Sequence, residues 1–129
     1  MILYAQVFGS LFGMLAIAFG AFGAHALKKT CTAEQLKSFE TGVKYQMYHA
    51  IILTVLGVNL TLETALERTM VWSFIIGTFL FSFSIYGLVL SASKGKKIRF
   101  LGPITPLGGL FLLLGWALLA YRFFTLSGR

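Results

Sequence analysis

Four long apolar runs dominate the sequence, and most charged residues fall between them. The runs cover residues 2–27, 45–62, 69–93 and 101–124. A helix needs about 20 apolar residues to cross a bilayer core. Only 12% of the residues are charged, against about 25% in an average soluble domain, and the runs lack the alternation of a membrane barrel. The sequence therefore predicts an all-α fold, a four-transmembrane-helix bundle forming one integral membrane domain.

The link between the first and second runs, residues 28–44, has a helical pattern of its own. Thr32 and Gln35 have the spacing of a capping box, in which two side chains satisfy free backbone N–H groups at a helix start. Apolar residues from Leu36 to Val43 then fall on one face. This pattern predicts a short amphipathic helix between the first and second spans, lying at the membrane interface or leading into the second span.

The basic residues are distributed unevenly between the two sides of the predicted bundle. Eight occur in the first and third links: Lys28, Lys29, Lys37, Lys44, Lys94, Lys96, Lys97 and Arg99. The other side has three, Arg68, Arg122 and Arg129. The positive-inside rule then places both basic links in the cytoplasm and both termini outside. The only cysteine, Cys31, is expected to be cytoplasmic and reduced.

The net charge of +7 is read as a topology signal and an attraction to anionic lipid head groups. The sequence contains no module that binds RNA or DNA, so no nucleic-acid partner is expected. The lipid bilayer is the expected partner. A homo-oligomer or another membrane protein is a further candidate.

Both histidines lie close to the first link. His25 precedes Lys28 by about 4.5 Å along a helix, and His49 follows Lys44 by about 7.5 Å. The two helices would leave the same link, so the imidazoles are predicted to lie at similar depth and to face each other. The candidate ligand-binding or polar network in this layer comprises His25, Tyr45, Gln46, His49, Ser91 and Thr105.

Simpler interpretations of these residues stay open. The histidines could hold two helices together by a hydrogen bond, and the tyrosines could anchor the protein at the interface. Small residues at helical spacing predict close helix packing, because lipid tails give helices no hydrophobic reason to associate. The glycines assigned to such packing are Gly9, Gly13, Gly20, Gly108 and Gly115.

Five motifs resemble one known family. They are Gly20-Ala-Phe-Gly-Ala-His25, Thr41-Gly-Val-Lys-Tyr-Gln-Met-Tyr-His49, Phe81-Ser-Phe-Ser-Ile-Tyr86, Thr105-Pro-Leu-Gly-Gly109 and Gly115-Trp116. In this order they are similar to the YgdD/YwdK-like small membrane proteins, a domain-of-unknown-function family whose animal relatives are called transmembrane protein 256. The resemblance implies four transmembrane helices in one bundle and a multi-pass protein of the bacterial inner membrane. It implies no particular activity.

Three classes of function follow. The first is a non-enzymatic membrane protein that binds a lipid, a small hydrophobic ligand or a partner protein at the polar layer. The alternative is a proton or small-solute transporter or channel using His25 and His49, although no span has an acidic residue or a lysine near its middle. A haem-binding redox protein is a third class. No catalytic residue, metal ligand or cofactor is assigned, because the chain lacks a nucleophile elbow, aspartate and metal-ligand spacing.

Overall fold

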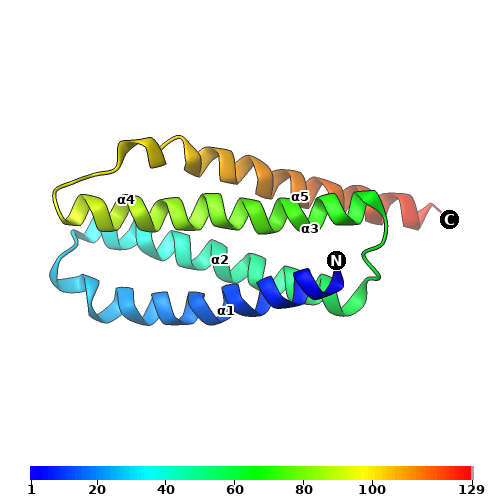
Figure 1. Ribbon diagram of the computed structural model, residues 1–129, viewed down its shortest axis with the longest axis horizontal. Helices are drawn as coiled ribbons and strands as arrows, with labels where there is room; N and C mark the ends of the chain where they lie inside the picture. The colour runs from blue at the N-terminus through cyan, green and yellow to red at the C-terminus, as the bar shows by residue number, and fades with distance from the viewer. Residues whose placement is uncertain (129) are drawn as a thin grey trace.

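A computed structural model of the protein describes residues 1–128, and Arg129, counted above among the basic residues of one side, lies outside that range. Within it the chain is all-helical, as predicted, and forms four helical rods side by side (Figure 1). The elements are α1 (Ile2–His25), η1 (Leu27–Lys29), α2 (Ala33–Asn59), α3 (Ala65–Thr78), η2 (Phe79–Phe83), α4 (Ser84–Ser93), η3 (Arg99–Leu101) and α5 (Ile104–Ser127).

Three helical stretches are long and apolar enough to cross a membrane. They are Ile2–Lys29, Ala65–Ser93 and Arg99–Ser127. The second stretch joins α3, the π-helical η2 and α4 into one rod. The start of α1 and the end of α5 lie toward one end of the bundle, and the links between α1 and α2 and between α4 and α5 lie at the other (Figure 1). We call the latter the basic end, because it carries the lysine-rich links.

The amphipathic segment is not a short helix at the interface but the first part of a longer helix, which leads directly into the second apolar run. Helix α2 runs unbroken for 27 residues from Ala33 to Asn59. The capping box itself is confirmed, since Thr32 Oγ1 accepts a hydrogen bond from the Gln35 amide at 3.1 Å and Gln35 Oε1 accepts one from the Thr32 amide at 2.9 Å. No proline or turn sequence follows, so a helix nucleated at the cap extends into the apolar run at little further cost.

The rods pack as two antiparallel pairs, α1 with α2 and the α3–α4 rod with α5. Close approach depends on glycines. A Cβ atom on Gly9 would lie 2.9 Å from the Thr54 amide nitrogen, and one on Gly108 would lie 2.8 Å from Phe81 Cα. Both distances leave no room for a methyl group, so these glycines let two helix backbones meet.

The other three glycines assigned to packing also face a neighbouring rod. A Cβ on Gly115 would meet the Phe74 ring at 2.8 Å. Gly13 and Gly20 are less tightly enclosed, because a Cβ there would lie 3.7 Å and 3.5 Å from the nearest side chains of α2. All five thus lie at helix contacts, with different tolerance for a larger residue.

A π-helical turn, η2, interrupts the third rod near its middle. Its Ser82 is completely buried and donates a hydrogen bond to the Gly42 carbonyl of α2 at 2.7 Å. Such wide turns change the direction in which side chains point from a helix. Here the turn lies where the third rod contacts both α2 and α5, so it connects the two helix pairs.

Candidate functional site

Gln46 ties three rods together in the interior. It is completely buried in α2. Its Nε2 donates to the Phe12 carbonyl of α1 at 2.8 Å, and its Oε1 accepts from the Tyr86 hydroxyl of α4 at 2.7 Å. Both ends of the amide are therefore used within the bundle. Sequence reasoning placed Gln46 in the polar layer but did not assign it these partners.

His49 forms a second interior hydrogen bond between helices, from α2 to α5. The residue is 3% exposed. Its Nδ1 lies 2.6 Å from the Tyr45 carbonyl, and its Nε2 lies 3.1 Å from Trp116 Nε1. A carbonyl can only accept and an indole N–H can only donate. The partners therefore assign a neutral imidazole with the proton on Nδ1, and both ring nitrogens are occupied.

The prediction that His25 and His49 face each other is wrong. His25 is exposed at the end of α1. Because α2 begins at Ala33, His49 lies well inside the helix, about 24 Å from its start. The contact between Gly13 and Ala50 puts His49 near the level of Gly13, about 18 Å from His25 along α1. Because one helix, α2, covers both the link and the second apolar run, the two imidazole rings lie far apart. They cannot bind the two faces of one haem.

The remaining predicted site residues are also separated. Tyr45 is 42% exposed and packs against Phe81. Ser91 holds the end of α4, because its hydroxyl donates to the Leu88 carbonyl and accepts from the Ile98 amide. Thr105, at the start of α5, is hydrogen-bonded to a serine of α4. The residues predicted to form a single polar layer thus belong to several separate hydrogen-bonded groups.

The interior polar groups are suited to holding helices together. Within residues 1–128, every buried side-chain nitrogen and oxygen has a hydrogen-bond partner. A proton relay needs groups that can exchange partners, whereas both ring nitrogens of His49 and both polar atoms of the Gln46 amide already have partners on other helices or on the α2 backbone. Over the same range no three His, Cys, Asp or Glu side chains gather as a metal site.

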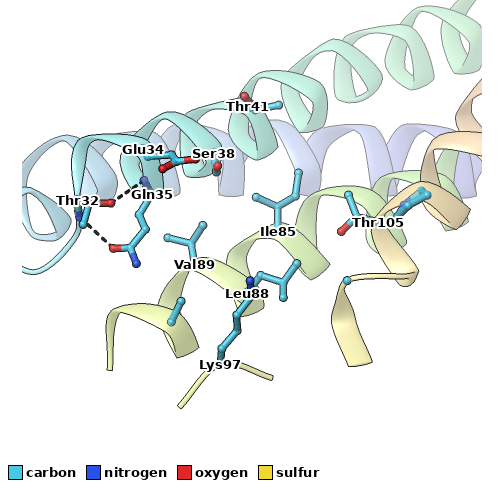
Figure 2. Close-up of a pocket in the computed structure, with 13 residues that line it drawn as sticks. Thr32, Glu34, Gln35, Ser38, Thr41, Ile85, Leu88, Val89, Lys97 and Thr105 are labelled. Carbon is cyan, nitrogen blue, oxygen red and sulfur yellow. Dashed lines mark hydrogen bonds between the residues drawn. The ribbon is translucent and has the colours of Figure 1, made fainter. Parts of the chain in front are cut away.

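A cleft at the basic end has a different character. It measures about 820 Å³ and lies between the first turns of α2, the last turns of α4 and the start of α5. Thr32, Glu34, Gln35, Ser38 and Thr41 form a polar wall on α2; Ile85, Leu88, Val89 and Ala92 form an apolar floor on α4; Lys97, Gly102, Thr105 and Pro106 complete the lining. Figure 2 shows the polar wall facing the apolar floor, with Lys97 extending from the link toward Leu88.

The polar wall follows from the periodicity of α2. Glu34, Ser38 and Thr41 succeed one another at spacings of four and three residues, so they share one face of the helix. The floor residues repeat in the same way along α4. Sequence reasoning included only Thr105 of this cleft among its candidates. The residues of the polar wall belong to the predicted link helix and Lys97 to the basic turn, whereas the floor residues and the start of α5 belong to the third and fourth apolar runs, which were expected to face lipid or neighbouring helices.

An ion pair lies at the opposite end of the bundle. Arg122 Nε of α5 is 2.8 Å from Glu67 Oε1 of α3, and the two side chains are 19% and 6% exposed. Glu67 is also the third residue of a capping box with Thr64. The sequence carried this second cap as Thr64-x-x-Glu67, but nothing in it paired Glu67 with a residue 55 positions away.

The fold is that of an all-helical membrane protein, because its outer faces are apolar and its interior polar side chains are hydrogen-bonded between helices. The family described as "Protein of unknown function (DUF423)" matches residues 19–109. The UPF0382 membrane protein of Staphylococcus aureus is 35% identical over 122 residues, which are 95% of this chain and 96% of the relative. The UPF0382 inner membrane protein YgdD of Escherichia coli is 37% identical over 119 residues, 90% of this chain and 86% of the relative.

A UPF0382 membrane protein of Haemophilus influenzae is 36% identical over 115 residues, which cover 89% of each chain. The chain belongs to this family of membrane proteins, and the resemblance seen in its motifs is confirmed. No solved structure matches it.

Proposed function

We propose that the protein is a four-span inner-membrane bundle that holds one amphiphilic lipid in the cleft at its basic end. The observation that carries this proposal is the composition of the cleft, in which a polar wall on α2 faces an apolar floor on α4. Neither a water-soluble metabolite nor a plain hydrocarbon uses both surfaces. An amphiphile places its head group against the first and its chain against the second.

The proposal treats α2 as the fourth span, beside the three stretches that are apolar enough by composition. Its 27 residues reach about 40 Å, more than the bilayer core of about 30 Å. The outward residues of its second half are apolar, as at Ile51, Val55 and Val58, which are 55%, 47% and 70% exposed. Its polar residues Gln46 and His49 face protein, where burial and hydrogen bonds make them acceptable in a membrane.

The proposed orientation places the basic end in the cytoplasm, as the positive-inside rule predicts. The first turns of α2, from Thr32 to Thr41, cover about 14 Å along the helix axis. This length extends through the head-group zone into the edge of the hydrocarbon. The polar wall then lies at the depth of lipid head groups, and the floor leads toward the acyl chains.

The size of the cleft supports one ligand. Its volume of about 820 Å³ lies within the range of about 300–1,000 Å³ of small-molecule sites. Transport is the weaker alternative, because the interior beyond the cleft is filled by packed side chains and by polar groups that already have partners. The proposed activity is therefore to bind and present a lipid at the cytoplasmic surface.

The test is a lipid with a photoactivatable group at mid-chain, in vesicles containing the purified protein. Illumination followed by peptide mass spectrometry should place cross-links on the cleft floor, at Ile85, Leu88 or Ala92. Ala92→Trp fills the cleft and should reduce these cross-links, whereas Ala120→Trp adds the same ring on an exposed part of α5 and should leave them unchanged. Cross-links spread evenly over the outer helix faces, or equal labelling of both variants, would reject the proposal.

A further inference from the structure

We infer that the cleft selects an amphiphile whose head group carries both a primary ammonium and a phosphate. This inference rests on the proposed function and adds the chemical class of the ligand. Its basis is a pair of opposite charges on the same cleft. Glu34 belongs to the wall formed by α2, and Lys97 enters from the link between α4 and α5.

The two charges do not neutralise each other. Within residues 1–128, the only ion pair closer than 4.0 Å joins Glu67 to Arg122, at the other end of the bundle. Figure 2 shows Glu34 on the wall and Lys97 on the opposite border of the cleft, with Leu88 and Val89 between them. A head group with a positive and a negative charge some distance apart matches this arrangement better than one with a single charge.

Some of the neighbouring polar groups make hydrogen bonds within the protein, and others are available to a ligand. Thr32 Oγ1 and Gln35 Oε1 each accept a capping hydrogen bond, so these two oxygens serve the start of α2. Thr41 donates its hydroxyl proton to the Lys37 carbonyl, which leaves its oxygen able to accept a further bond. Ser38 has no side-chain hydrogen bond to another residue of the described chain, so its hydroxyl can serve a ligand beside the Glu34 carboxylate.

The chemistry assigns a partner to each charge. A primary ammonium offers three N–H donors, which suit the carboxylate of Glu34 and the hydroxyl oxygen of Ser38, one helical turn further along α2. Phosphate oxygens suit the ammonium of Lys97, since charge-assisted hydrogen bonds are the stronger ones. A quaternary ammonium has no N–H to donate, and an anionic head group would be repelled by Glu34.

The main competitor is a purely anionic lipid. The links at this end hold several further lysines, which attract anionic head groups to the surface in general. Such attraction acts outside the cleft and depends on total charge. Selection inside the cleft depends on Glu34 and Lys97 individually, so single neutral substitutions separate the two effects.

The experiment is native mass spectrometry of the protein with equimolar phosphatidylethanolamine, phosphatidylcholine and phosphatidylglycerol. Ala92→Trp is measured in parallel, and the lipid that it retains is subtracted as lipid bound outside the cleft. The wild-type protein should prefer phosphatidylethanolamine. Glu34→Gln should reduce this preference about twofold to fivefold, the effect of one exposed ion pair, and Lys97→Gln should weaken retention of the same lipid by a similar factor.

Glu40→Gln and Lys96→Gln are matched controls, because both residues are exposed and neither lines the cleft; the preference should survive in both. Equal retention of the three lipids in the cleft, or a preference for phosphatidylglycerol, would overturn the head-group assignment and leave the lipid-binding function standing. Equal lipid retention by the wild type and Ala92→Trp would overturn both.

Discussion

Replacing Gln46 with leucine tests whether the interior polar groups hold the bundle together. The side chain is completely buried, and leucine has a similar size, so packing changes little. The Phe12 carbonyl, in the middle of α1, keeps its backbone partner within the helix. The Tyr86 hydroxyl loses its acceptor, Gln46 Oε1 at 2.7 Å, and is left in apolar surroundings with its residue 6% exposed.

The expected loss follows from that orphaned donor. Leaving a buried hydrogen-bonding group unsatisfied costs about 1–3 kcal/mol, so Gln46→Leu should lower the free energy of unfolding by this amount. Tyr86→Phe removes the donor and leaves the amide oxygen unpaired instead. The double variant has neither orphan and should lose less than the sum of the single effects. The coupling should be about 0.6–1.7 kcal/mol, from the average to the largest value measured between helices in a membrane protein.

Unfolding in mixed micelles by increasing dodecyl sulfate, followed by tryptophan fluorescence, provides the measurement. Thr69→Val is the control, because the Thr69 hydroxyl is exposed and bonds only to the Ala65 carbonyl of its own helix; its effect should stay within about 0.5 kcal/mol. Strictly additive effects of Gln46→Leu and Tyr86→Phe, or an unchanged stability of Gln46→Leu, would refute the tie between α2 and α4.

Three further predictions concern packing, the ion pair and topology. Gly9→Ala should destabilise the bundle by about 1–3 kcal/mol through overpacking, whereas Gly13→Ala, whose Cβ would lie 3.7 Å from its nearest neighbour, should be tolerated in the same unfolding assay. Glu67→Gln keeps the capping box, since glutamine also serves there, but loses its charge and should cost about 1–3 kcal/mol; a stability equal to wild type would show that the pair contributes nothing. Cys31 should react in intact cells with permeant thiol reagents only, and Ser127→Cys with impermeant ones as well; the opposite labelling would reverse the orientation.

The helical class and several local features could be predicted from the sequence because they depend on neighbouring residues. Long apolar runs require helices in lipid. The cap at Thr32 needs only a partner three residues away, and it forms as predicted. Glycines spaced at helical intervals indicate the faces that pack, and Gly9 and Gly108 do lie where backbones meet.

The candidate site could not be predicted in the same way. The depth of His49 depends on where α2 begins and on its continuity through Lys44, and the apolar run at residues 45–62 indicates neither. Its partner Trp116 is 67 residues distant. The cleft needs α2, α4 and the start of α5 to meet at one end, which is a property of long-range packing. Local spacing shows that Glu34 and Ser38 share a face but not what that face meets.

The measurement that tests the central claim most directly is an experimental density map of the protein in a lipid nanodisc. The account predicts four rods crossing the bilayer and one elongated density in the cleft, with its chain along Ile85 and Leu88 and its head group between Glu34 and Lys97. A map in which the cleft is closed by protein side chains, or in which α2 lies outside the hydrocarbon layer, would contradict it.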